Sequence, residues 1–204
     1  MIEIKEVCRQ DYKKAQKFAI QGMHLDWYID SKVILDLYAK YFWYMELNRA
    51  TKVYGAYADD IFVGVLLAEI KNEPKRYYSV SKAIYVKIFD WLQHLVAGKG
   101  IEEYDEANKD MYKSFCQKNR PDGEIIFAAD PDCKIKGIGT ALLSAFEKDE
   151  SGKLIYLYTD NACTYQFYEH RGFERSEERQ VVLDLDKKQV PLTCMFYTKK
   201  ITEQ

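Results

Sequence analysis

Apolar and polar residues follow two different periods along this chain, and each change of period marks a predicted element. Alternation at every second position predicts a strand, whereas apolar residues three and four positions apart predict a helix. The predicted strands are residues 1–7, 51–58, 61–70, 124–130, 153–159, 181–185 and 192–199. The predicted helices are residues 11–23, 31–45, 79–97, 101–116, 137–149 and 164–171. This order predicts an α/β (α+β) fold with a mixed sheet.

Breaks in the pattern indicate how the elements are connected. Asp59 and Asp60 join two strands as a hairpin, and the second strand, residues 61–70, is apolar enough to lie at the centre of a sheet. Residues 71–123 form a separate block, in which two helical patterns are separated by a glycine-containing turn. We interpret this block as a helical hairpin inserted between strands of one domain that spans residues 1–204.

Composition narrows the class of protein. Hydrophobic residues make up 48% of the 204 residues and aromatic residues 15%, which is enough for a buried core. The formal net charge of -2 gives no overall positive field, and this argues against a nucleic-acid partner. The charged run 174–179 is predicted to be a solvated segment. No apolar run reaches the roughly 20 residues of a membrane span.

Cysteine and histidine usage indicates the compartment and the absence of a metal site. The five cysteines are scattered, odd in number and without a CxxC pair, and the three histidines are scattered as well. No metal-ligand spacing results, so no metal is expected. Unpaired cysteines of this kind are typical of reduced thiols in the cytosol. We therefore expect a cytoplasmic protein that has no membrane anchor.

Two glycines, Gly137 and Gly139, stand where a predicted strand gives way to a helix. The first N–H groups of a helix lack partners and carry a partial positive charge, so they attract phosphate where no side chain covers them. Lys134 and Lys136 add positive charge at the same turn. The spacing matches neither a GxxxxGK[ST] phosphate loop nor a three-glycine dinucleotide fingerprint. Taken alone, the glycines are more simply explained as turn residues.

A second motif changes that interpretation. The segment "FYEHRGF" carries an aromatic pair on a short predicted helix, which Gly172 is placed to end in a left-handed conformation. The two motifs in this order resemble the GNAT superfamily of N-acetyltransferases. The family turn (Q/R)xxGxG/A is matched by Lys134, Gly137 and Gly139, with lysine in place of Gln or Arg. The family element FYxxxGF is matched by Phe167, Tyr168, Gly172 and Phe173.

The resemblance is strongest over residues 124–173 and implies a fold and a co-substrate. The implied fold is a mixed, mostly antiparallel sheet of about seven strands flanked by helices, with residues 71–123 inserted before the cofactor-binding strand. The implied co-substrate is acetyl-CoA, held in a wedge between parallel strands 124–130 and 153–159. The cofactor-binding residues expected by resemblance are Phe127, Ala128, Ala129, Lys134, Ile135, Lys136, Gly137, Ile138, Gly139, Thr140, Asn161, Tyr165 and Tyr168.

The resemblance also implies a catalytic role for one tyrosine. Tyr168 matches the family residue that protonates the departing thiolate, and Tyr165, one helical turn earlier, is the obvious substitute. The alternative role for Tyr168 is core packing. Glu124 is the predicted base, with Glu69 and Asp130 as alternatives, and a water relay is a further option.

The acceptor amine is expected to bind the loop between the first two helices. Asp26, Trp27 and Tyr28 combine acidic and aromatic groups that can hold a cation, although the two rings are equally well explained by packing. Cys163 is discounted as an acyl carrier, because the family transfers the acetyl group directly. The insertion at 71–123 has three open roles, which are to cover the acceptor cleft, to form a homodimer contact, or neither.

Three functions follow from these motifs. The leading one is an N-acetyltransferase that moves an acetyl group from acetyl-CoA to a primary amine of a small molecule or peptide. The second is a catalytically inactive acyl-CoA-binding sensor or interaction module of the same fold. The third, an acetyltransferase associated with nucleic acid, is disfavoured by the near-neutral charge balance.

Overall fold

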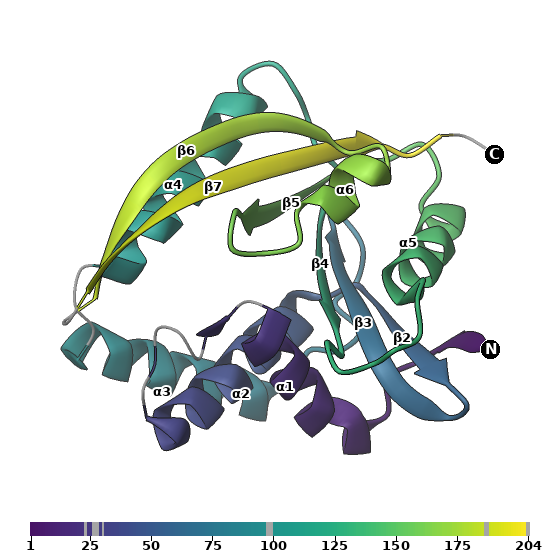
Figure 1. Cartoon of the computed structure of the whole chain (residues 1–204), viewed down its shortest axis with the longest axis horizontal. Coiled ribbons are helices and arrows are strands. Elements are labelled where there is room, and N and C mark those ends of the chain that lie inside the picture. The colour runs from purple at the N-terminus through teal and green to yellow at the C-terminus, as the bar shows by residue number, and fades with distance from the viewer. Residues whose placement is uncertain (23, 26–28, 30, 97–99, 186–187, 203–204) are drawn as a thin grey trace.

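The computed structural model describes residues 1–204 except 23, 26–28, 30, 97–99, 186–187 and 203–204 (Figure 1). The strands are β1 (Ile2–Lys5), β2 (Lys52–Ala58), β3 (Ile61–Ile70), β4 (Gly123–Ala129), β5 (Leu154–Asp160), β6 (Glu174–Leu185) and β7 (Lys188–Lys200). The helices are η1 (Arg9–Asp11), α1 (Tyr12–Gly22), α2 (Lys32–Arg49), α3 (Val80–Val96), α4 (Gly100–Cys116), α5 (Ile138–Asp149) and α6 (Gln166–His170).

The strands form one sheet in the order β1-β2-β3-β4-β5-β7-β6. Every neighbouring pair is antiparallel except β4 and β5, which run parallel. The mixed, mostly antiparallel sheet is therefore confirmed. β3 lies between β2 and β4 and is buried along most of its length, which confirms its predicted central position.

Helices cover both faces of this sheet, and alternate residues of the central strands point to opposite sides. On one face, α5 packs through Leu142 and Phe146 on a core that includes Leu66 and Ile125. On the other face, α1 and α2 pack on Val65 and Leu67, and α4 packs on the far half of the sheet, as Figure 1 shows. The second face thus has two separate covers, one on each side of the β4–β5 pair.

The hairpin between β2 and β3 turns at Asp59 and Asp60, as predicted. Both residues have positive φ angles, 50° and 62°, which match the two left-handed positions of a type I′ turn. Aspartate tolerates this conformation because its short side chain can bond to nearby backbone. Gly172 likewise has a φ of 76°, one residue beyond the Arg171 cap of α6, so its predicted left-handed conformation is confirmed.

The prediction of a helical hairpin at residues 71–123 is wrong in its packing. Both helices form, but α3 packs against α2 and α4 packs against β6 and β7, on the other side of the β4–β5 pair (Figure 1). On α3, Phe89 stacks on Tyr41 of α2, with ring centroids 4.7 Å apart. On α4, Phe115 meets Phe196 of β7 at 5.2 Å. The apolar faces of α3 and α4 each pack on an aromatic side chain outside residues 71–123. Because these partners lie on different parts of the fold, the two helices lie apart.

The closing hairpin is longer than its apolar pattern predicts. The charged run 174–179 forms the first half of β6, which pairs with β7 from Glu174 onward. β6 is an edge strand of the sheet, and most side chains of this run are exposed. Charged side chains suit an edge strand because they discourage pairing with another chain. The run is therefore solvated as predicted, but it belongs to a strand.

Candidate active site

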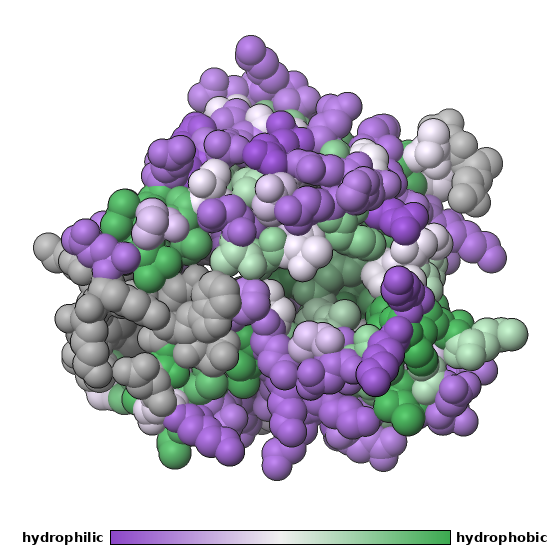
Figure 2. All heavy atoms as spheres, viewed as in Figure 1, coloured by the Kyte–Doolittle hydropathy of each residue, from purple (hydrophilic) through white to green (hydrophobic). Residues whose placement is uncertain are grey.

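Strands β4 and β5 separate immediately after they meet. Their parallel pairing covers only two positions, Gly123 with Ile155 and Glu124 with Tyr156. Beyond Glu124, β4 keeps its partner β3 as far as Ala129, whereas its other edge loses β5. Backbone groups of residues 127–129 that point toward β5 are therefore available to a ligand. The molecular surface is hollowed over this splay, as Figure 2 shows.

The glycine turn lies at the end of β4 and begins α5. Gly137 precedes the helix with a φ of 90°, and a Cβ placed on it would meet nothing within 4 Å. The first helical hydrogen bond runs from the Ala141 N–H to the Gly137 carbonyl, so the N–H groups of residues 138–140 precede it. Lys134 and Lys136 are exposed beside this turn. The arrangement fits an anionic group such as a pyrophosphate.

Gly139 has a different role from Gly137. A Cβ at Gly139 would lie 2.9 Å from Cζ of Phe167, on the helix α6. The absence of a side chain therefore lets the aromatic ring of α6 approach the first turn of α5. This contact joins the two motifs, because one glycine of the turn and the phenylalanine of "FYEHRGF" are packed together.

Tyr168 lies on α6 against the aromatic lining of the splay. Its ring is 5.9 Å from the ring of Phe127 on β4 and 5.8 Å from that of Phe173. Burial raises the pKa of the Tyr168 hydroxyl above its usual value, and the nearby Cys163 thiol adds to this effect. The phenol therefore stays protonated at neutral pH. Among the described residues it has no hydrogen-bond partner, so its proton is available to a ligand.

The loop after β5 connects the splay to α1. The Asn161 side-chain oxygen accepts a 2.8 Å hydrogen bond from the Thr193 N–H, which fixes the loop to β7. The Cys163 thiol donates to the Gly22 carbonyl at 3.6 Å, so the end of α1 lies beside this loop. Burial, followed by the charge of Asp160, raises the pKa of Cys163 to about 12. A thiol this weakly acidic is a poor nucleophile, which agrees with its exclusion as an acyl carrier.

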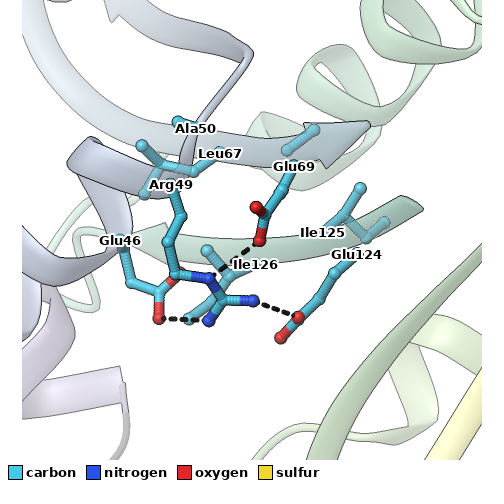
Figure 3. Close-up of a pocket in the computed structure, with 9 residues that line it drawn as sticks. Glu46, Arg49, Ala50, Leu67, Glu69, Glu124, Ile125 and Ile126 are labelled. Atoms are coloured by element: carbon cyan, nitrogen blue, oxygen red, sulfur yellow. Dashed lines mark hydrogen bonds and ion pairs between the residues drawn. The ribbon is translucent and has the colours of Figure 1, made fainter. Parts of the chain in front are cut away.

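A cluster of charged residues lies where the splay begins, on the face of the sheet that α2 covers, opposite to the face covered by α5. Arg49, in the last turn of α2, donates from Nε to Glu69 at 2.8 Å and from Nη2 to Glu124 at 2.6 Å. Its Nη1 is 3.5 Å from Glu46, one turn earlier on the same helix. Figure 3 shows the guanidinium between the three carboxylates. The cavity lined by this cluster has a volume of about 10 Å³, enough for about one water molecule.

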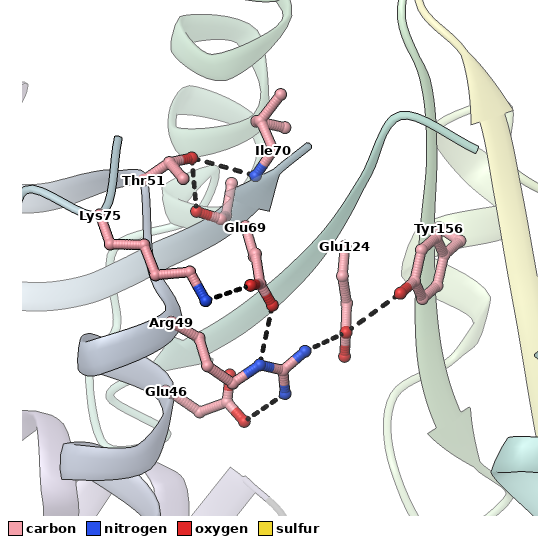
Figure 4. Close-up of polar contacts among 9 residues, drawn as sticks. Glu46, Arg49, Thr51, Glu69, Ile70, Lys75, Glu124 and Tyr156 are labelled. Atoms are coloured by element: carbon pink, nitrogen blue, oxygen red, sulfur yellow. Dashed lines mark hydrogen bonds and ion pairs between the residues drawn. The ribbon is translucent and has the colours of Figure 1, made fainter. Parts of the chain in front are cut away.

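Two further groups complete the cluster (Figure 4). Lys75 binds the second oxygen of Glu69 at 2.8 Å, and the Tyr156 hydroxyl of β5 donates to Glu124 at 3.2 Å. Three carboxylates thus face two cations, Arg49 and Lys75. Burial, together with the charges of Glu124 and Glu69, raises the pKa of Glu46 to about 7 although Arg49 opposes the shift. Glu46 can therefore gain or lose a proton near neutral pH.

Helix α4 forms the other wall of this face. The Tyr104 hydroxyl of α4 donates to Asp160, at the end of β5, over 3.3 Å. Burial raises the pKa of Tyr38 on α2 to about 12, and the negative charge of Asp105 on α4 contributes. The two covers of this face, α2 and α4, therefore present tyrosines and carboxylates on both sides of the splay.

Comparison with known proteins tests the fold. Neither the family models nor the curated proteins match the sequence. Among solved structures, the yncA protein of Salmonella typhimurium, solved with its cofactor acetyl-CoA, has a TM-score of 0.54 at 12% identity, over 100% of this chain and 95% of its own. A GNAT-family protein from Desulfovibrio desulfuricans has a TM-score of 0.51 at 14% identity, over 99% and 100%. This chain has the GNAT fold.

A third structure of this fold comes from an enzyme with a protein substrate. The ribosomal-protein-alanine N-acetyltransferase from Brucella melitensis has a TM-score of 0.52 at 13% identity, over 97% of this chain and 99% of its own. At such low identities the likeness concerns the fold, and activity has to be argued from the site. The resemblance predicted from the two motifs is thus confirmed at the level of the GNAT fold.

Most residues expected to bind the cofactor are grouped by the GNAT fold around the splay. Phe127, Ala128 and Ala129 lie on the strand edge that leaves β5, and the described turn begins α5 beside it. Ile138 differs from the others, because its side chain is buried in the core and only its backbone lies at the turn. Thr140 and Tyr165 are half-buried nearby, and the Arg175 guanidinium lies 5.3 Å from the Tyr165 ring.

The three candidate bases, Asp130, Glu69 and Glu124, have different hydrogen-bond and ion-pair partners. Asp130 caps its own turn by accepting the Asp132 N–H at 3.0 Å. Glu69 and Glu124 share Arg49. Neither Glu46 nor Arg49 is predicted from the sequence as a site residue, although their spacing of three residues on one helix is typical of a side-chain pair.

The predicted acceptor-binding residues Asp26, Trp27 and Tyr28 lie outside the described part of the chain. The described end of α1, at Gly22, lies beside Cys163 and so close to the splay. Within the described residues, no group of three or more histidine, cysteine, aspartate or glutamate side chains could hold a metal ion. In that same part of the chain, every helix is too short or too polar to cross a lipid bilayer.

Proposed function

We propose that this chain is an N-acetyltransferase that uses acetyl-CoA to acetylate a primary amine of a small molecule or peptide. The observation that carries the proposal is the splay of β4 and β5 after Glu124, with an uncovered helix start on one side and Tyr168 on the other. The acetyl-CoA-bound yncA structure, which shares the fold, supports the choice of co-substrate.

The residues that would hold acetyl-CoA fit its chemistry. The N–H groups that open α5 would bind the pyrophosphate, with Lys134 and Lys136 adding positive charge. The free edge of β4 at Phe127, Ala128 and Ala129 would bond to the pantetheine amides. The Asn161 side chain, whose oxygen is already bonded to Thr193, retains its NH₂ group for the same arm.

The reaction joins the amine nitrogen to the thioester carbonyl carbon and breaks the carbon–sulfur bond. Tyr168, whose phenol is protonated at neutral pH, would give its proton to the departing sulfur. The amine would lose its proton toward Glu124, directly or through a water molecule in the adjoining cavity. Tyr156 and Arg49 hold Glu124 in place for this step. We place the reaction in the cytoplasm, where free cysteines remain reduced.

One observation favours the second function, an acyl-CoA-binding module without catalysis. The Glu124 carboxylate is already engaged by Arg49 at 2.6 Å and by Tyr156 at 3.2 Å. A carboxylate that already accepts two hydrogen bonds has fewer lone pairs free to take up the proton of an amine. The two functions share the cofactor site and differ only in turnover.

Calorimetric titration with acetyl-CoA, followed by an assay of free thiol release with a panel of amines, tests both functions. Saturable binding together with amine-dependent thiol release supports the acetyltransferase. Saturable binding without release for any amine, from diamines to peptide N-termini, supports the binding module. A folded protein that does not bind acetyl-CoA contradicts both.

A further inference from the structure

Helix α3 has an apolar face that the described residues leave exposed. Five large side chains recur on it at intervals of three or four residues, and each is 44% to 65% exposed: Val80, Ile84, Ile88, Trp91 and Leu92. Residues at these intervals share one side of a helix. Tyr85 and Phe89, which point to the neighbouring side, make the contacts with α2. The uncovered side is therefore additional to the packing that holds α3 in place.

Helix α2 extends this apolar face. Val33, Ile34 and Leu37, in its first turns, are 44% to 69% exposed. The Tyr85 hydroxyl of α3 donates to the Leu37 carbonyl at 3.2 Å, and Tyr41 of α2 donates to Asp90 of α3 at 2.6 Å. The end of α2 lies by the start of α3, where Asn48 accepts a 3.0 Å hydrogen bond from the Ser79 N–H, and the Tyr38 ring lies 6.1 Å from that of Phe89 in the second half of α3. The two helices therefore run antiparallel. We call the eight exposed side chains of the two helices the α2–α3 outer face.

The area of the α2–α3 outer face is that of a protein interface. Eight side chains that are about half exposed or more present roughly 700–900 Å² of apolar surface, whereas the largest apolar patch on a typical monomer is about 300–600 Å². A stable interface of standard size buries about 800 Å² on each partner. The face therefore supplies, without any other surface, what one side of a dimer needs.

We propose that the α2–α3 outer face joins two copies of this chain about a two-fold axis. An antiparallel helix pair with apolar residues at 84, 88 and 91 can pack on its own copy as a four-helix bundle. A two-fold interface brings the same surface patch together from both copies, so one apolar patch is sufficient. The proposal does not depend on the acetyltransferase function.

Charges around the face favour a second copy over a lipid surface. Lys87 on α3 and Asp36 on α2 are exposed on the two helices that carry the face and supply charges of opposite sign. A rim of mixed sign can pair with itself across a two-fold axis. Helices that lie on anionic membranes instead carry Lys and Arg along the whole polar face.

Sedimentation of the full chain from 1 to 100 µM tests the proposal, because the monomer mass is 24.0 kDa and a dimer has twice that mass. The wild type should sediment as a dimer. Ile88→Glu and Trp91→Lys should each weaken association at least ten-fold, because each buries a charge in the interface. Both positions are more than half exposed in the monomer, so circular dichroism should show an unchanged fold.

Ile61→Glu is the matched control, because Ile61 is 57% exposed, close to the 55% of Ile88, and lies at the start of β3. It should leave the dimer intact. A wild type that is monomeric at 100 µM would overturn the proposal. So would a dimer that resists both variants, or one that Ile61→Glu also dissociates. Co-sedimentation of a monomeric wild type with vesicles of phosphatidylglycerol would assign the face to a membrane instead.

Discussion

Arg49 of α2 donates a 2.6 Å hydrogen bond to Glu124 of β4, at the last position where β4 and β5 are paired. The same guanidinium binds Glu69, which lies directly opposite Glu124 in the β3–β4 register. Like charges directly opposite each other in a sheet are destabilising, and Arg49 offsets this repulsion. One side chain therefore joins the helix cover to two central strands at the start of the splay.

Arg49→Gln should lower the free energy of unfolding by about 1–3 kcal/mol, because it leaves two opposed carboxylates without their shared cation. Urea unfolding at neutral pH measures this loss. Arg49→Lys is the control that keeps the charge but cannot bond to both carboxylates at once. Its free energy of unfolding should lie between those of the wild type and Arg49→Gln. If Arg49→Gln unfolds at the same urea concentration as the wild type, the bridge makes no contribution to stability.

Glu46 should make the stability of this protein depend on pH around neutrality. Burial raises its pKa in the folded state to about 7, from an unfolded value near 4.5. The folded state therefore binds the proton more tightly, so this contribution is complete below pH 4.5 and is lost as the pH rises to 7 and above. Glu46→Gln removes the dependence, and its unfolding free energy relative to wild type should rise by about 2 kcal/mol between pH 5 and pH 8.

Glu69→Gln is the matched control for this pH effect, because the pKa of Glu69 is shifted in the opposite direction to that of Glu46. Burial raises the pKa of Glu69, but the hydrogen bonds from Lys75 and Arg49 outweigh burial and lower it overall. The contribution of Glu69 is present above its unfolded pKa and is lost as the pH falls below that value. Parallel curves for Glu46→Gln and wild type from pH 5 to 8 would show that Glu46 does not titrate in this range.

Sequence patterns predict most elements of this fold but not which elements pack together. The apolar faces of α3 and α4 are both visible in the helical period, yet periodicity does not say what covers a face. The aromatic partners of these helices, Tyr41 and Phe196, lie on α2 and β7. The first half of β6 is missed for a related reason, since an exposed edge strand lacks the apolar alternation that identifies buried strands.

The two halves of the candidate site differ in the same way. The proposed cofactor half is visible in the sequence because its residues form two short continuous motifs, and the structure brings these motifs into contact through Gly139 and Phe167. The charged half is assembled from Arg49, Glu69 and Glu124, which are separated by 20 and 75 positions in the chain. No local pattern connects residues at such distances, so only the sheet register reveals that they meet.

The two glycines of the turn should respond differently to substitution. Gly139→Ala places a Cβ 2.9 Å from the Phe167 ring, so α6 must move, and stability should fall by about 1–3 kcal/mol. Phe167→Leu in the same chain should recover part of this loss. Thermal unfolding of the single and double variants measures the recovery, and strictly additive losses would show that the two residues are not coupled.

Gly137 should affect binding more than folding. A side chain there meets no protein atom, but it would stand over the N–H groups that begin α5. Gly137→Asn is the suitable variant, because asparagine tolerates the positive φ of 90° better than other side chains. It should weaken acetyl-CoA binding about ten-fold or more in calorimetry while the melting temperature stays within a few degrees. Unchanged affinity would remove the turn from the cofactor site.

Tyr168→Phe should separate chemistry from binding. The hydroxyl has no hydrogen-bond partner among the described residues, and the ring contacts with Phe127 and Phe173 survive the change, so folding and acetyl-CoA affinity should stay the same. Loss of a general acid should lower kcat about 100-fold or more, measured as thiol release with an amine that the wild type acetylates. Tyr165→Phe, one turn earlier, should keep most of the activity. If the two variants behave alike, the proton reaches the departing sulfur from water, and Tyr168 serves only to line the splay.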